Sequence, residues 1–177
     1  MVGVNWTISP APIAGPEALA TVRAYLDDII SRYYGRPATA EEIDQTLAEE
    51  RDDELAPPTG RFLLARAEDE GAVAGCAGVR MLDEKTAELR RVWVVPQARG
   101  NGLGTRLVAA AEHAAVELGA AAIRLDTRSD LVEARRLYAR RGYEDIPAYN
   151  DSPYAGHWLE KRLAGAPASR PATALRR

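Results

Sequence analysis

Apolar positions along the chain follow two periods, and the changes between them mark the predicted elements. Where apolar residues recur every three or four positions, as over residues 17–34, an amphipathic helix is predicted. Thr39 followed by Glu42 has the spacing of a capping box, which predicts the start of a second helix. Glycines follow the last periodic residue of two further segments of this kind. The predicted helices cover residues 17–34, 39–50, 102–118 and 131–141.

Shorter apolar segments bounded by turn residues predict strands. They lie at about residues 2–8, 61–67, 73–82, 86–95, 121–127, 143–146 and 156–163. The resulting order of elements predicts a mixed α/β fold in which helices cover a central sheet. We expect one domain over residues 1–163, and a disordered tail over the Ala- and Pro-rich residues 164–177.

Composition and charge restrict the classes of function. The 177 residues suffice for one domain with a buried core, and 46% of them are hydrophobic. A net charge of −3, with both signs mixed along the chain, argues against nucleic-acid binding, which usually needs a basic face. No apolar run approaches the roughly 20 residues of a membrane span, and no signal peptide is visible. We therefore expect a cytoplasmic protein that binds neither nucleic acid nor membrane.

The residues that bind metals or form disulfides are few. Cys76 is the only cysteine, so no disulfide within the chain is possible, which suits a reducing compartment. His113 and His157 are the only histidines and lie far apart, so we expect no metal site. Cys76 stands among small apolar residues, and we interpret it as a buried hydrophobe rather than an acyl-carrying nucleophile.

The segment with the clearest chemistry is a glycine-rich turn between a strand and a helix. Glycines alternate at Gly100, Gly102 and Gly104, directly after Arg99. Glycine permits unusual backbone angles and lets a ligand approach the main chain closely. The first N–H groups of a helix lack internal partners and carry partial positive charge, so this turn predicts a phosphate or pyrophosphate site.

Two other phosphate-binding motifs are excluded by the same residues. No Lys-Ser/Thr pair follows the glycines, as a Walker P-loop requires. A dinucleotide-binding Gly-x-Gly-x-x-Gly would place its third glycine at position 105, where the chain has Thr105. A tight turn that merely packs a helix on a sheet remains the simpler alternative.

Two motifs together indicate a family. Residues 99–104, Arg-Gly-Asn-Gly-Leu-Gly, resemble the Arg/Gln-x-x-Gly-x-Gly/Ala signature of the GCN5-related N-acetyltransferase (GNAT) family. Residues 134–143, Ala-Arg-Arg-Leu-Tyr-Ala-Arg-Arg-Gly-Tyr, resemble that family's Ala-x-x-Leu-Tyr-x-x-x-Gly-Phe/Tyr segment. The motifs stand in family order, and the order of elements matches over nearly the whole chain. The resemblance implies a mostly antiparallel sheet of about seven strands, splayed between the fourth and fifth, with about four helices.

The resemblance also implies how the donor, acetyl-CoA, would bind. The pantetheine arm would pair with the main chain of the strand that precedes the turn. Many members have a polar asparagine where this chain has Leu131, which leaves one expected contact open. Arg135 either approaches the 3′-phosphate or belongs to a solvated helix face. The implied donor contacts are Trp93, Val94, Val95, Arg99, Gly100, Asn101, Gly102, Leu103, Gly104, Thr105, Leu131 and Arg135.

Two residues are candidates for the acid and the base of amine acetylation. Tyr138 occupies the place of a family tyrosine near the thioester sulfur, where its phenol would protonate the leaving thiolate. Its alternative role is packing of a helix aromatic on the sheet. Glu88 starts the strand that leads into the donor site and is the candidate base for the acceptor amine. Its alternative role is pairing with a neighbouring arginine.

The sequence says least about the acceptor that receives the acetyl group. Its pocket is expected between the first two helices and the late strands, with the candidates Tyr33, Tyr34, Tyr149 and Asn150. Each of them also suits a loop or packing role. We expect a small-molecule amine acceptor and consider a homodimer an open question. Protein or peptide acetylation and a non-catalytic acyl-CoA sensor remain the alternative functions.

Overall fold

The computed structural model describes residues 4–69 and 71–164. The seven strands of its sheet are β1 (Trp6–Pro10), β2 (Gly60–Ala67), β3 (Val73–Met81), β4 (Thr86–Val94), β5 (Ala122–Thr127), β6 (Glu144–Asp145) and β7 (His157–Arg162). The α-helices of the described residues are α1 (Pro16–Tyr34), α2 (Ala40–Glu49), α3 (Leu103–Glu117) and α4 (Val132–Arg140). The predicted mixed α/β fold is confirmed, with element ends shifted by a few residues. The predicted tail lies outside the described residues, apart from residue 164.

The strands follow the order β1-β2-β3-β4-β5-β7-β6, and only the pair β4–β5 is parallel. Pairing of β4 with β5 covers only Thr86–Glu88 against Ala122–Arg124. Beyond Glu88 the two strands diverge, so the predicted splay between the fourth and fifth strands is confirmed. Main-chain groups on the facing edges of a splayed pair are left without a strand partner, and a ligand that enters the gap finds them.

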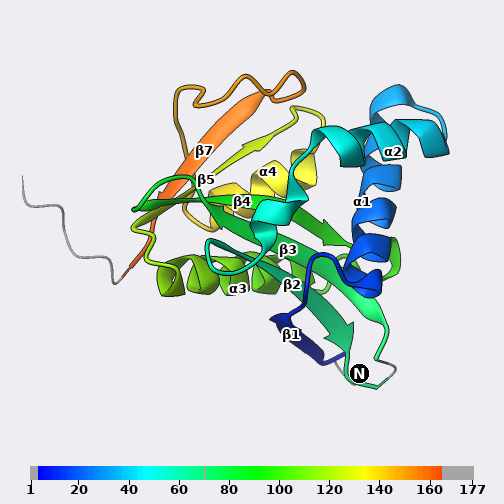
Figure 1. Cartoon of the computed structure of the whole chain (residues 1–177), viewed down its shortest axis with the longest axis horizontal. Coiled ribbons are helices and arrows are strands. Elements are labelled where there is room, and N and C mark those ends of the chain that lie inside the picture. The colour runs from blue at the N-terminus through cyan, green and yellow to red at the C-terminus, as the bar shows by residue number, and fades with distance from the viewer. Residues whose placement is uncertain (1–3, 70, 165–177) are drawn as a thin grey trace, which may run out of the picture.

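Helices cover both faces of the sheet, as Figure 1 shows. On one face α3 packs through Leu103, Leu107 and Val108, together with Tyr138 of α4. On the other face α1 and α2 pack on the sheet through a second core. The cores are kept apart by the alternation along β2, where Leu63 belongs to the first and Phe62 and Leu64 to the second.

Local signals in the sequence explain where the helices start and stop. The Thr39 hydroxyl accepts the N–H of Glu42, and the Glu42 carboxylate accepts the N–H of Thr39, which completes the predicted capping box. Gly35 ends α1 with a left-handed backbone at φ 66°. These two ends fix the turn that brings α2 into contact with α1.

A β-bulge interrupts β4, and the sequence pattern did not predict it. Gly78 pairs with Arg90 and Cys76 with Trp93, so Ala77 faces both Arg91 and Val92. Arg91 adopts φ 55°, which a non-glycine residue rarely does. Its guanidinium is buried and forms ion pairs with Glu50 and Asp52. These acidic partners stabilise the extra residue at this place.

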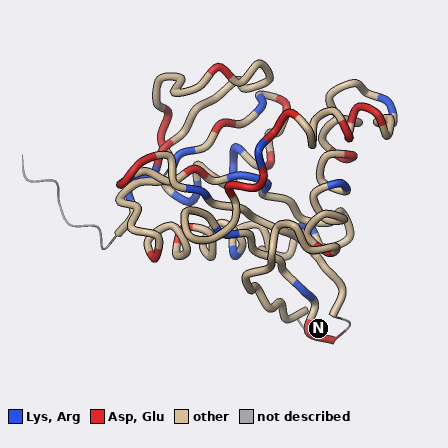
Figure 2. The backbone as a smooth tube through the Cα atoms, in the orientation of Figure 1, with Lys and Arg blue, Asp and Glu red and all other residues tan. Residues whose placement is uncertain are grey.

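Charges of both signs are interspersed along the backbone, as Figure 2 shows. Many of them pair with one another across elements, such as Arg61 of β2 with Glu117 of α3. No helix in the described part of the chain is long and apolar enough to cross a membrane.

Candidate active site

A cavity of about 1320 Å³ opens where β4 and β5 diverge. Residues from α1, α2 and α4, from β3, β4 and β5, and from the turn before α3 line it. The predicted phosphate turn, Tyr138 and Glu88 all lie on its wall. The structure therefore brings the main predicted site groups into one space.

The turn before α3 has the backbone of an anion site. Gly100 and Gly102 have left-handed φ angles of 80° and 79°, and a Cβ on either would meet no atom within 4 Å. Their sides are thus open, and the glycines are needed for the backbone angle rather than for space. The first hydrogen bond of the helical pattern in α3 runs from the Arg106 N–H to the Gly102 carbonyl at 3.2 Å. The N–H groups of Leu103, Gly104 and Thr105 precede it and stay available for an anion.

Arg99, at the start of this turn, is held by two other elements. Its Nε donates to the Val94 carbonyl at 2.9 Å, and its Nη2 contacts Asp28 Oδ2 of α1 at 2.5 Å. Trp93 Nε1 donates to the same Asp28 oxygen at 2.9 Å. Burial alone would raise the pKa of Asp28, but the hydrogen bonds from Trp93 and Arg99 hold it below its usual value. Asp28 thus connects α1 to both the edge of β4 and the phosphate turn.

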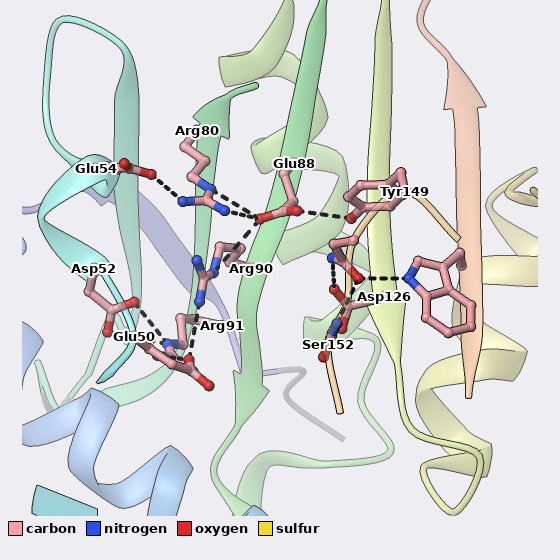
Figure 3. Close-up of polar contacts among 12 residues, drawn as sticks. Glu50, Asp52, Glu54, Arg80, Glu88, Arg90, Arg91, Asp126, Tyr149 and Ser152 are labelled. Carbon is pink, nitrogen blue, oxygen red and sulfur yellow. Dashed lines mark hydrogen bonds and ion pairs between the residues drawn. The ribbon is translucent and has the colours of Figure 1, made fainter. Parts of the chain in front are cut away.

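Glu88 lies at the point where the strands part, on the last residue of β4 that pairs with β5. It is 5% exposed. Its Oε1 accepts from Arg80 Nε at 3.0 Å, and its Oε2 accepts the Tyr149 hydroxyl at 2.9 Å (Figure 3). Both oxygens of the predicted base are therefore engaged by donors.

The contacts of Glu88 belong to a longer chain of charges on the same face of the sheet. Arg80 also pairs with Glu54, and Arg90 with Glu50 at 3.1 Å. Burial, then the charge of Glu88, raises the pKa of Tyr149, so this phenol stays protonated and keeps donating. Tyr149 was predicted as an acceptor contact, but it lies against Glu88 and is not among the residues that line the cavity.

Tyr138 of α4 is 6% exposed and lines the cavity. Its ring packs edge-to-face on Tyr143, with centroids 5.5 Å apart. Burial raises the pKa of Tyr138, and the nearby Tyr25 and Asp126 raise it further. The phenol therefore remains protonated at neutral pH and is able to donate a hydrogen bond. Tyr138 therefore both packs on Tyr143, as predicted, and lines the cavity.

Exposed tyrosines surround the mouth of the cavity. Tyr33 stacks edge-to-face with Tyr34 at 5.0 Å and with Tyr154 at 5.2 Å between centroids. The Arg128 guanidinium lies over the Tyr33 ring at 5.2 Å. The predicted acceptor contacts Tyr33 and Tyr34 therefore line the cavity, as does Asn150.

Three predicted donor residues do not line the cavity. The Val95 N–H donates to the Ala74 carbonyl of β3 at 2.9 Å and is not available for the pantetheine. The Asn101 amide folds back on the Ala98 and Arg99 carbonyls, at 3.5 and 3.3 Å. Arg135 contacts the Ser129 carbonyl at 3.3 Å on an exposed face. The other predicted donor contacts, Leu131 included, line the cavity.

Some groups of the site were not predicted from the sequence. Asp28, Arg80 and Asp126 line the cavity, yet none of them stands in a recognisable motif. The only signal for Asp126 is the alternation Ile123-Arg124-Leu125-Asp126, which places it opposite the buried face of β5. Among the described residues, no group of His, Cys, Asp and Glu is arranged to hold a metal ion.

Comparison with known proteins identifies the family. Residues 23–143 match the model of the acetyltransferase (GNAT) family. The chain belongs to this family. It is a GNAT-type N-acetyltransferase, in agreement with the resemblance of its two motifs.

This GNAT chain has relatives along most of its length. An uncharacterized N-acetyltransferase of Schizosaccharomyces pombe is 29% identical over 147 residues, which cover 82% of this chain and 88% of that protein. An acyl-CoA N-acyltransferase structure from Klebsiella pneumoniae superposes with a TM-score of 0.68 at 27% identity, covering 89% of this chain and 97% of that one. A GNAT acetyltransferase from Elizabethkingia anophelis with acetyl-CoA bound has a TM-score of 0.62 at 18% identity, covering 90% and 99%. The last likeness is one of fold.

Proposed function

We propose that the protein transfers an acetyl group from acetyl-CoA to the amine of a small acceptor by direct attack. The observation that carries this proposal is the common cavity. It holds free main-chain N–H groups at the start of α3, the diverging edge of β4, and the phenol of Tyr138. The N–H groups and the strand edge would bind a thioester that carries phosphates, and the phenol would protonate its leaving thiolate.

The residues present fit acetyl-CoA, which supplies an activated acetyl thioester. Leu103, Gly104 and Thr105 would bind its pyrophosphate through their N–H groups. Trp93 and Val94 lie on the edge of β4 that faces the splay and line the cavity, so they would hold the pantetheine arm. Tyr138 would donate its proton to the sulfur as the thioester breaks.

Direct attack, rather than an acyl-enzyme, is supported by Cys76. Its thiol is fully buried, donates to the Arg91 carbonyl at 3.1 Å, and does not line the cavity. Burial raises its pKa to about 12, so the thiolate needed for acyl transfer is scarce at neutral pH. The acceptor nitrogen therefore reacts with the thioester itself.

A carboxylate must take the proton of the acceptor ammonium, and the sequence offers Glu88 as a candidate for this role. Glu88 lines the cavity, but its oxygens already accept from Arg80 and Tyr149. To act as the base it would have to exchange one of these donors for the amine or for a bridging water, which disfavours it in this role.

A small acceptor suits the walls better than a protein chain does. The aromatic contact of Tyr33 with Tyr154 joins α1 to the segment before β7 across the cavity mouth. Helix α2 supplies another wall. A peptide would need an open groove along this side.

The test measures release of CoA thiol from acetyl-CoA across a panel of small amines, with CoA affinity by calorimetry. We expect CoA to bind in the micromolar range and at least one small amine to raise thiol release. Tight CoA binding without stimulation by any amine would favour the sensor alternative. Absence of CoA binding would overturn the proposal.

A further inference from the structure

Asp126 occupies a particular place on β5. Ile123, Leu125 and Thr127 of this strand are buried, and the residues between them point to the opposite face. Arg124 is the last residue of β5 that pairs with β4, opposite Glu88. Asp126 follows two positions later, beyond the point where the strands part, and it lines the cavity.

Arg124 and Arg128, two positions before and after Asp126, form ion pairs with other carboxylates. Arg124 contacts Glu160 Oε2 at 2.5 Å. Arg128 contacts Asp130 Oδ2 at 2.7 Å and donates to the Ile29 carbonyl. Neither of them neutralises Asp126.

Other half-buried or buried carboxylates of this cavity do have cationic partners. Asp28 pairs with Arg99, Glu50 with Arg90, and Glu88 with Arg80. Among the described residues, the only hydrogen bond to Asp126 comes from the neutral amide of Asn150, whose Nδ2 donates to Oδ2 at 2.7 Å. Asp126 thus contributes a negative charge that no described cation offsets.

The contacts of Asn150 fix which of its atoms faces Asp126. Its Oδ1 accepts from Trp158 Nε1 at 2.8 Å and from the Ser152 N–H at 3.3 Å. With the oxygen so engaged, the amide nitrogen must point to the carboxylate. One oxygen of Asp126 is held in place, and the other, Oδ1, has no donor in the described part of the chain.

Asp126 also lies close to the predicted acid. Its charge is one of the causes, after burial and Tyr25, that raise the pKa of Tyr138. Both residues also line the same cavity. An amine bound to the carboxylate would stand beside the thioester whose sulfur Tyr138 serves.

From this arrangement we infer that Asp126 is the residue that binds the acceptor's reacting ammonium and takes its proton. The acceptor class is then a primary amine that enters as a cation. Glu88, tied to Arg80 and Tyr149, would instead position the strands around it. This inference rests on the proposed function.

The proton and bond changes balance as follows. The ammonium gives one proton to Asp126 Oδ1, and the neutral nitrogen forms a C–N bond with the thioester carbonyl carbon. The C–S bond breaks, the sulfur leaves with the electron pair, and it takes a proton from Tyr138. The acylated nitrogen loses its second proton to the resulting phenolate, and Asp126 releases its own to solvent. The sum is an amide, a free thiol and one proton.

The test uses the full chain saturated with CoA and two probes of similar shape, benzylammonium and neutral benzyl alcohol. Binding is followed by NMR titration, so no turnover is needed. A charge-assisted hydrogen bond predicts that the wild type binds the cation about 10-fold more tightly than the alcohol. Asp126→Asn should lose that preference, while Glu88→Gln should keep it.

The controls separate this inference from the proposed function. Calorimetry on each variant checks that CoA still binds, and thermal unfolding checks the fold. If Asp126→Asn does not fold, Asp126→Ser removes the same charge with less bulk. A wild type that binds CoA but does not prefer the cation, or an Asp126 variant that keeps the preference, overturns the inference and leaves the acetyl-CoA proposal standing. Failure of the wild type to bind CoA contradicts the proposed function itself.

Discussion

One wall of the cavity, formed by residues 99–105, offers main-chain N–H groups, and we call it the donor wall. The wall formed by β3, β4 and β5, which we call the acceptor wall, offers side chains that are hydrogen-bonded to one another. The first depends on two left-handed glycines and the start of one helix. The second depends on a chain of contacts from Glu54 through Arg80 and Glu88 to Tyr149. A change at the donor wall should therefore alter binding with little effect on the fold. A change at the acceptor wall should alter stability as well as activity.

The largest expected effect comes from Gly102→Glu in the donor wall. It adds bulk at a left-handed position and a negative charge where a pyrophosphate is proposed to bind. We expect CoA affinity, measured by calorimetry, to fall by about 100-fold or more. Gly119→Glu is the matched control, because Gly119 lies beyond the other end of α3 with φ 99°. Equal losses of affinity in the two variants would contradict the placement of the pyrophosphate.

The second expected effect separates chemistry from binding within the cavity. Tyr138→Phe removes the phenol proton but keeps the ring that packs on Tyr143. We expect turnover to drop by roughly 100-fold at unchanged CoA affinity. Tyr143→Phe serves as the control, since Tyr143 does not line the cavity. Undiminished turnover in Tyr138→Phe would remove Tyr138 from the mechanism.

The third tests whether the acceptor wall is a structural network. Glu88→Ala leaves the half-buried Tyr149 hydroxyl without its acceptor and leaves Arg80 with Glu54 alone, so the free energy of unfolding should fall by about 2–3 kcal/mol. Glu88→Gln should cost less, because its carbonyl oxygen still accepts. Glu117→Ala breaks the exposed pair with Arg61 and should cost at most about 1 kcal/mol in the same denaturant titration. A Glu88→Ala loss as small as that control would show that the network adds no stability.

The smallest effect concerns α2, which lines the cavity away from the turn at residues 99–105 in the chain. Thr39→Ala removes half of the capping box and should lower the free energy of unfolding by about 1 kcal/mol. We expect the KM of the acceptor to rise while CoA affinity stays constant. Thr7→Ala, on an exposed strand position, should leave both unchanged. A weaker CoA affinity in Thr39→Ala would mean that the two walls are not independent.

The difference between the walls also explains how much could be predicted from the sequence. Glycine spacing reports backbone geometry directly, so the sequence alone locates the turn at Gly100 and Gly102. Helix periodicity and the Thr39 capping box place the elements within a few residues. The splay between β4 and β5 followed only from the family resemblance.

Side-chain pairing across strands is not visible in a single sequence. No residue near Glu88 in the sequence predicts that Arg80 and Tyr149 donate to its two oxygens. These contacts depend on the register of the strands and on the loop before β7. The same holds for Asp126 and Asn150, which are 24 positions apart. The bulge at Arg91 was also missed, since an arginine carries no local signal for a left-handed backbone.

The bulge at Arg91 divides β4 into two short strands with a corner between them. Before the corner, Glu88 and Arg90 point toward the acceptor side. After it, Trp93 points that way again, although an unbroken alternation would have turned it toward α3. If the strand ran through Arg91 without the bulge, everything from Val92 onward would turn to the opposite face of the sheet. Donor and acceptor halves of the strand are thus free to vary in sequence separately, provided that the corner itself is retained.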